Sequence, residues 1–207
     1  MRLLHINASP RKENSRTLEI STEFLNSLQE KVSDLSVKTI NVFEENLPAI
    51  NGLEANTKML LMGGVAIDEQ AQKAWESIDA YSRDFVSHDG YLITAPMWNF
   101  GLPYQLKHYI DVIVQAGILF HYTANGPEGL VKGKKMYVIT SRGGDYSQDS
   151  PMNQFDFMEN YLKSIFGFVG IYDVSFIHAQ PLDLGPELKE QGMNKAKESA
   201  RELALSV

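Results

Sequence analysis

The chain has 207 residues, of which 43% are hydrophobic and 22% are charged, a composition that suits one globular domain with a sizeable core. It has no cysteine, which excludes disulfides, thiolate metal ligands and a redox-active thiol. Its net charge of −7 argues against a general affinity for nucleic acid or for an anionic membrane. Because no apolar run resembles a secretory signal or approaches the roughly 18 residues of a membrane span, we expect a cytoplasmic protein.

Five short apolar segments predict the strands of a sheet. In chain order they cover residues 3–8, 37–43, 91–95, 136–141 and 174–179. The third and fourth segments are nearly continuous apolar runs, which is typical of parallel strands that are covered on both faces.

Helical patterns fill the intervals between these segments. We predict helices over residues 17–31, 68–87, 102–116, 153–168 and 186–205. The alternation predicts an α/β fold with a doubly wound, five-stranded parallel sheet, strand order 2-1-3-4-5 and helices on both faces. With no internal repeat and no linker, we expect residues 1–207 to form a single domain.

Two stretches are longer than ordinary connections. Residues 43–90 contain a turn at 46–52 and an apolar patch of ambiguous structure in addition to the predicted helix. Residues 117–135 contain a polar segment that we read as a long loop. Long ordered loops are uncommon and often functional.

Ligands of doubly wound sheets bind at the carboxyl ends of the strands, close to the first strand. The loop after the first strand, residues 9–17, carries the hydroxyls of Ser9, Ser15 and Thr17 together with the basic Arg16. It leads into a helix, whose N-terminus receives phosphate well because its N–H groups are unpaired. The alternative is that Ser15 only caps that helix.

The loop after the third strand is unusually rich in large apolar side chains. Its residues are Pro96, Met97, Trp98, Asn99 and Phe100. Such groups are unfavourable at a solvent-exposed strand end unless a flat partner covers them, and the amide of Asn99 suits the edge of a heterocycle. The alternative is a hydrophobic plug between sheet and helix.

The loop after the fourth strand reads Ser141, Arg142, Gly143, Gly144. Paired glycines let backbone N–H groups approach a ligand without an intervening Cβ. An ordinary glycine turn is the alternative. Three such loops at one edge of a sheet are less easily explained by chance than any one of them.

Competing motifs are absent. There is no G-x-G-x-x-G, and the nearest phosphate-loop candidate has Glu128 where the first glycine is required. Of the histidines, His5 and His178 lie in predicted strands, and we expect His88 and His108 on helix surfaces. We therefore predict no metal site.

With these loops identified, the chain resembles the FMN-dependent NADH-azoreductase family of flavodoxin-like quinone reductases. The resemblance rests on Ala-Pro-Met-aromatic-Asn-Phe at 95–100, Tyr-Thr-x-x-Gly-Pro-Glu-Gly-Leu at 122–130 and Ser-Arg-Gly-Gly at 141–144. It extends through residues 166–171 and so covers the whole chain. Trp98 stands where the family usually has tyrosine, and Thr17 where it usually has serine.

The resemblance implies a bound FMN whose phosphate contacts Ser9, Ser15, Arg16 and Thr17. It also implies that residues 96–100 line the flavin ring and that residues 141–144 meet its pyrimidine edge. NADH or NADPH would be the electron donor, and a quinone or an azo compound the acceptor, bound alternately.

The same resemblance implies a homodimer with active sites at the subunit interface. Phe120 and Tyr122 match positions near the substrate pocket, and Tyr122 is a candidate proton donor. Other functions remain open at this point. A flavodoxin-like electron carrier would share the fold, although its usual Thr-x-Thr-Gly loop is absent, and a non-redox module could bind another phosphate compound.

Overall fold

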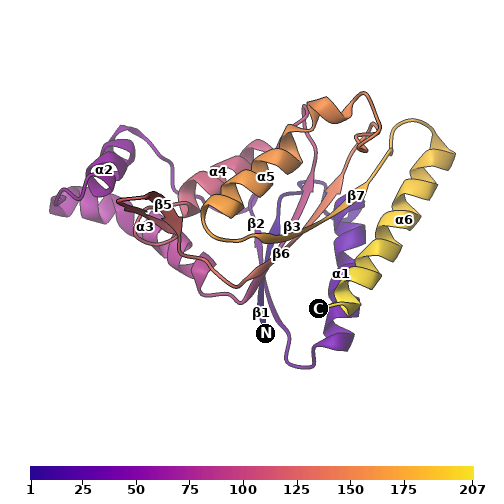
Figure 1. Ribbon diagram of the computed structural model, residues 1–207, viewed down its shortest axis with the longest axis horizontal. Coiled ribbons are helices and arrows are strands. Elements are labelled where there is room, and N and C mark those ends of the chain that lie inside the picture. Colours follow the sequence, from indigo (N-terminus) through magenta and orange to yellow (C-terminus); the bar gives the residue numbers. More distant parts are fainter.

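A five-stranded parallel sheet forms the centre of the computed structural model, which describes residues 1–207 (Figure 1). Its strands are β1 (Arg2–Asn7), β2 (Ser36–Asn41), β3 (Gly90–Pro96), β6 (Lys135–Ser141) and β7 (Asp173–Ala179). They lie in the order β2-β1-β3-β6-β7, and all neighbours are parallel. This confirms the predicted order 2-1-3-4-5, with strand ends within two residues of those predicted.

Helices cover both faces of the sheet, as the alternation of apolar segments predicted. They are α1 (Arg16–Lys31), α2 (Gly52–Met62), α3 (Glu69–Val86), α4 (Tyr104–Ile113), α5 (Phe157–Phe168) and α6 (Pro186–Leu205). Helices α1 and α6 pack side by side on one face, and α4 and α5 cover the other (Figure 1). None of the helices combines the length and apolar character needed to cross a membrane.

Alternate residues of each strand supply the two halves of the core. In β1, Leu3 faces α1 and α6, where it belongs to a cluster with Phe24 and Leu28. The next residue, Leu4, faces the opposite cluster, which contains Leu106 of α4 and side chains of α5. This alternation explains why the central strands are apolar at nearly every position.

Helix α4 is shorter than the predicted 102–116. It begins after Pro103, which occupies its N-cap position, and ends at Ile113. The side-chain amide of Gln115 donates to the carbonyls of Asp111 and Val112, each at 2.8 Å, and so satisfies two acceptors at the end of the helix.

Two elements were not predicted. The apolar patch in residues 43–90 forms α2, whose start carries a capping box between Asn51 and Glu54. The expected loop in residues 117–135 contains an antiparallel hairpin of β4 (Phe120–Thr123) and β5 (Gly126–Gly129). Helix α2 and the adjoining end of α3 extend away from the sheet (Figure 1).

The placement of His88 on a helix surface was wrong. His88 lies just beyond α3, is only 7% exposed, and its ring Nδ1 donates to the carbonyl of Asp84 at 2.8 Å. His108 lies on α4 but is half-buried, with Nε2 at 2.9 Å from the carbonyl of Pro48. Each ring donates to a backbone carbonyl, which makes the burial of His88 and the partial burial of His108 favourable.

The buried His5 makes stability depend on pH. Burial lowers the pKa of His5 from 6.5 to about 4, so only the unfolded chain binds this proton between those values. Stability therefore rises with pH across that window, by about 3 kcal/mol from this residue. We expect His5→Gln to lose this contribution, measured as the difference in unfolding free energy from wild type at pH 7 and pH 4. Replacing the exposed His121 by Gln is the control. If the unfolding free energies of wild type and of His5→Gln changed with pH in parallel, the pH dependence would not come from His5.

Candidate functional site

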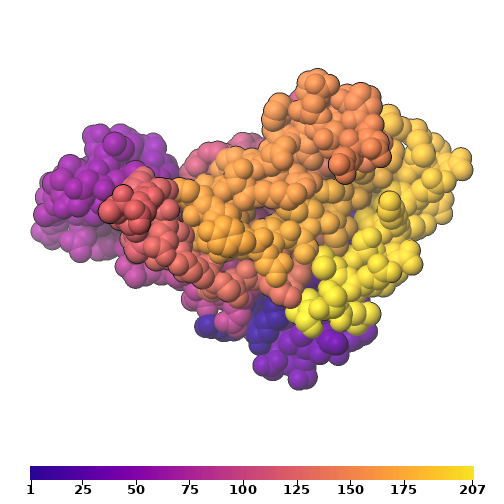
Figure 2. Space-filling model, in the orientation of Figure 1, coloured from indigo at the N-terminus to yellow at the C-terminus, as the bar shows by residue number.

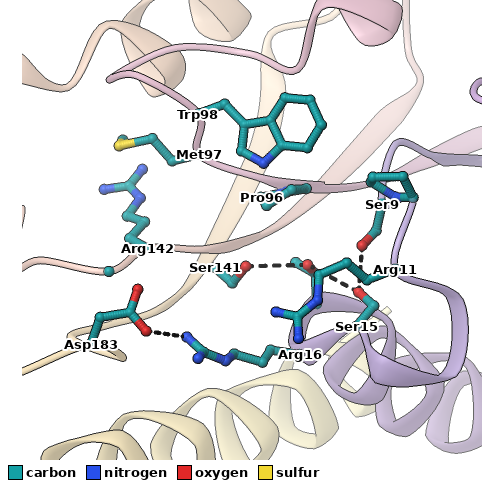
Figure 3. A pocket seen from close by; sticks show the side chains of 13 residues that line it. Ser9, Arg11, Ser15, Arg16, Pro96, Met97, Trp98, Ser141, Arg142 and Asp183 are labelled. Atoms are coloured by element: carbon teal, nitrogen blue, oxygen red, sulfur yellow. Dashed lines mark hydrogen bonds and ion pairs between the residues drawn. The ribbon is translucent and has the colours of Figure 1, made fainter. Parts of the chain in front are cut away.

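The three loops identified from the sequence meet at the carboxyl edge of the sheet, where they enclose a cavity of about 230 Å³ (Figure 3). Ten of the predicted cofactor residues line it: Ser9, Ser15, Arg16, Thr17, Pro96, Met97, Trp98, Ser141, Arg142 and Gly143. Asn99, Phe100 and Gly144 belong to the same loops but lie outside the cavity lining. Pro10, Arg11 and Asp183 complete the wall.

A row of four hydroxyls lies at the N-terminus of α1. The Ser9 hydroxyl donates to that of Ser15 at 2.6 Å, Ser15 donates to Thr17 at 3.4 Å, and the Thr17 and Ser141 hydroxyl oxygens are 3.3 Å apart (Figure 3). Ser15 also caps α1, because its oxygen accepts from the N–H of Leu18 at 3.1 Å. Hydroxyl donors beside a helix N-terminus are a favourable environment for a phosphate. The capping and ligand-binding interpretations of Ser15 are therefore compatible.

Asp183 is the principal residue of the cavity that sequence reasoning missed. It lies between β7 and α6, and its Oδ1 is 2.7 Å from Nη1 of Arg16. The ion pair ties this loop to the start of α1 (Figure 3). Nothing in the local sequence distinguishes Asp183 from a surface acid, and only its position after the last strand could have suggested it.

The loop after β3 contains a tight and unusual turn. Trp98 and Gly101 exchange two backbone hydrogen bonds, of 3.0 and 2.9 Å. Between them, Asn99 and Phe100 have φ values of 47° and 69°, in the left-handed region that few non-glycine residues adopt. Such conformations concentrate at functional sites.

This turn directs its two aromatic side chains to different neighbours. Trp98 packs against Phe43 at 5.7 Å between ring centroids, and Phe100 packs against Phe155 at 5.4 Å. Trp98 is 37% exposed and Phe100 is 39% exposed, so neither side chain acts as a simple buried plug. Met97 and Trp98 give the cavity an apolar wall opposite its polar end.

The glycine loop leaves two backbone donors free. The N–H groups of Gly143 and Gly144 donate to no acceptor within the chain. The carbonyl of Gly143 accepts from the N–H groups of Leu182 and Asp183, at 3.1 and 2.9 Å, which fixes this loop against the one that carries Asp183. The loop is therefore held in place with its donors unused.

The Arg142 side chain is fully buried in the wall of the cavity. Its Nη1 is 2.7 Å from Oδ2 of Asp156, its Nε donates to the Thr140 hydroxyl at 3.2 Å, and its Nη2 has no hydrogen-bond partner. Burial lowers the pKa of Arg142 and the nearby carboxylates oppose the change, but an arginine stays charged at neutral pH.

The predicted substrate residues lie apart from this cavity. Phe120 is 5% exposed and packs against Phe168 at 4.7 Å between ring centroids. Tyr122, on the outer part of the hairpin, is 56% exposed. Neither residue lines the cavity within one chain.

Comparison with known proteins agrees with this arrangement. A family model described as a flavodoxin-like fold matches residues 1–204, and the chain belongs to that family. It is 36% identical over 205 residues to an FMN-dependent NADH:quinone oxidoreductase of Nitratidesulfovibrio vulgaris, covering 98% of each chain. It is 38% identical over 204 residues to a protein of the same name from Bradyrhizobium sp., covering 99% of this chain and 100% of the relative.

Solved structures agree with these sequence relatives. An FMN-dependent NADH-azoreductase of Bacillus anthracis, in complex with FMN, matches with a TM-score of 0.85 and 30% identity, over 98% of this chain and 99% of that one. Another azoreductase from Bacillus anthracis matches over the full length of both chains, with a TM-score of 0.90 and 27% identity. The resemblance inferred from the three loop motifs is thus confirmed.

The contact between Gly143 and Asp183 predicts an effect of adding one methyl group. A Cβ on Gly143 would lie 2.6 Å from Oδ2 of Asp183. We expect Gly143→Ala to displace the exposed Asp183 carboxylate and weaken its ion pair with Arg16, which lowers the unfolding free energy by about 1 kcal/mol or less. The cost should largely disappear when Gly143→Ala is made in an Asp183→Ala background.

Gly144→Ala is the matched control, because its Cβ would first meet a Tyr146 ring atom at 3.4 Å. Denaturant unfolding of the four variants measures these differences. Equal costs for Gly143→Ala with and without Asp183 would show that this contact does not constrain the loop.

Proposed function

We propose that this chain is an FMN-dependent oxidoreductase that passes two electrons from NADH to quinones and to azo compounds, with residues 1–207 as one catalytic domain. One observation carries the proposal: a hydroxyl-lined helix N-terminus and an apolar aromatic wall face the same cavity. FMN has the matching combination of an anionic phosphate and a flat ring. The names of the full-length relatives support NADH as donor and quinones and azo compounds as acceptors.

The phosphate end of the cavity fits the residues present. The hydroxyls of Ser9, Ser15 and Thr17 offer donors to phosphate oxygens, and the N-terminus of α1 adds the favourable end of its dipole. Arg16 lies beside them, although its charge is partly balanced by Asp183. Because the whole chain carries a net charge of −7, these local groups must attract the anion.

The opposite end fits the flavin ring. In this proposal the ring is lined by Pro96, Met97, Trp98, Asn99 and Phe100, and its pyrimidine edge meets Ser141, Arg142, Gly143 and Gly144. The unused N–H groups of the two glycines match the carbonyl oxygens of a pyrimidine edge. An exposed indole at Trp98 gives an apolar surface where a second flat molecule can stack.

When bound, FMN supplies the redox chemistry, by taking a hydride from the nicotinamide and passing two electrons to the acceptor. The protein positions the two partners in turn and excludes water from the ring. The free N–H groups of Gly143 and Gly144 stabilise negative charge that develops next to them. Since Tyr122 lies outside the cavity of its own chain, it can donate a proton only from a partner subunit or after rearrangement.

A homodimer gives a role to the exposed apolar residues. Met59 on α2 is 68% exposed and Tyr122 on the β4–β5 hairpin is 56% exposed. Both lie on segments that stand away from the sheet in Figure 1, and Figure 2 shows them as outlying parts of the surface. We propose that these segments contact a second copy, so that Phe120 and Tyr122 approach the partner's cavity.

Anaerobic spectroscopy tests the proposed function. We expect the purified protein to bind FMN and turn yellow, NADH to bleach the flavin absorbance, and a quinone to restore it. NADPH in place of NADH measures donor preference, and an azo dye in place of the quinone measures acceptor range. A protein that binds no FMN, or whose bound FMN is not reduced by either nicotinamide, would refute the proposal.

A further inference from the structure

Arg142 stands in the wall between two cavities. It lines the flavin cavity described above and also a second, polar cleft of about 470 Å³. Its two acidic partners, Asp156 and Glu159, line only the second cleft. Arg142 is therefore the charged group of this cluster nearest the flavin cavity, while its carboxylate partners lie on the side of the second cleft. In Figure 3 its side chain extends away from the hydroxyl row, on the same side of the view as Met97.

The charged side chains of the cluster formed by Arg142, Asp156 and Glu159 differ in their exposure to solvent. The Arg142 side chain is 1% exposed, and its Nη2 lacks a hydrogen-bond partner. Glu159 is 24% exposed, is 3.8 Å from that Nη2, and also pairs with Lys163 and with His178. Its negative charge is thus balanced by other groups and screened by solvent in the cleft. Arg142 and Asp156, whose side chain is 6% exposed, form a buried pair that solvent does not screen, so the field of the guanidinium at the flavin cavity is opposed mainly by Asp156.

We propose that Arg142 raises the reduction potential of the bound flavin by stabilising its reduced, anionic form, and that Asp156 limits the size of this effect. The inference rests on the proposed function. A hydride from NADH leaves NAD⁺ and a reduced flavin with one additional negative charge. A fixed, poorly solvated cation next to the ring end of the cavity stabilises that charge and has little effect on the neutral oxidised ring.

A purely structural role for the ion pair makes a different prediction. If Arg142 and Asp156 only anchor the loop and the start of α5, removing either one loosens the same loop and shifts flavin binding in the same direction. If charge is what matters, removing the cation and removing the anion shift the potential in opposite directions. The sign of the effect in two variants therefore distinguishes the two explanations.

The experiment compares Arg142→Met and Asp156→Asn as FMN-loaded proteins. The affinities for oxidised and for reduced FMN are measured, together with the midpoint potential. For Arg142→Met we expect reduced FMN to bind about tenfold more weakly relative to oxidised FMN, equivalent to a potential about 30 mV lower for two electrons. For Asp156→Asn, which keeps a side-chain oxygen able to cap α5, we expect a higher potential.

Lys163→Met is the matched control, because it removes one positive charge from the same cluster but at a side chain that is 54% exposed. The midpoint potential of FMN bound to Lys163→Met should stay close to that of FMN bound to the wild-type protein. If Arg142→Met retains no flavin, Asp156→Asn and Glu159→Gln decide the question, and both should raise the potential. Potentials that are unchanged, or that fall in all variants, overturn the inference while leaving the proposed function intact. A wild-type protein that binds no FMN refutes the proposed function itself.

Discussion

The hydrogen-bonded contact between the start of α1 and the end of β6 is the interaction on which the site depends. Thr17 and Ser141 are 124 residues apart in the chain, yet their hydroxyl oxygens are 3.3 Å apart. The contact exists because α1 packs across β3 onto β6, and because β1, β3 and β6 are parallel, so that the loops after them lie at the same edge of the sheet. Strand order thus places a hydroxyl-lined helix N-terminus, an aromatic wall and free backbone donors around one cavity.

The charged groups of the site are arranged in pairs. Arg16 is matched by Asp183, and Arg142 by Asp156. In the proposed function, an anion would therefore be held less by net charge than by oriented dipoles and hydroxyls, in a protein whose overall charge is −7. The two pairs also connect the cavity loops to the segments that precede α6 and α5. These two ion pairs therefore both hold the cavity loops in place and set the charge around the cavity.

Strong local patterns made much of this structure predictable. Apolar runs located all five sheet strands, and the three loops at their carboxyl ends contained twelve of the thirteen residues that line the cavity. Helix α2 was missed because its apolar residues do not form a buried stripe: only Thr57 is buried, and Met59 is 68% exposed. Asp183 and the burial of His88 depend on contacts with distant segments, which local sequence does not reveal. Local sequence likewise does not indicate the left-handed φ values of Asn99 and Phe100, because few residues other than glycine adopt them.

Comparing the affinities of the apo-protein for FMN and for riboflavin tests the central claim most directly, because the two ligands differ only in the phosphate. Hydrogen bonds to charged groups contribute about 1.5–3 kcal/mol each, so we expect FMN to bind at least a hundredfold more tightly. The same titration of a Ser15→Ala, Thr17→Val double variant should remove most of that difference. Equal affinities of the wild-type protein for the two ligands would show that the hydroxyl row at α1 does not hold the phosphate.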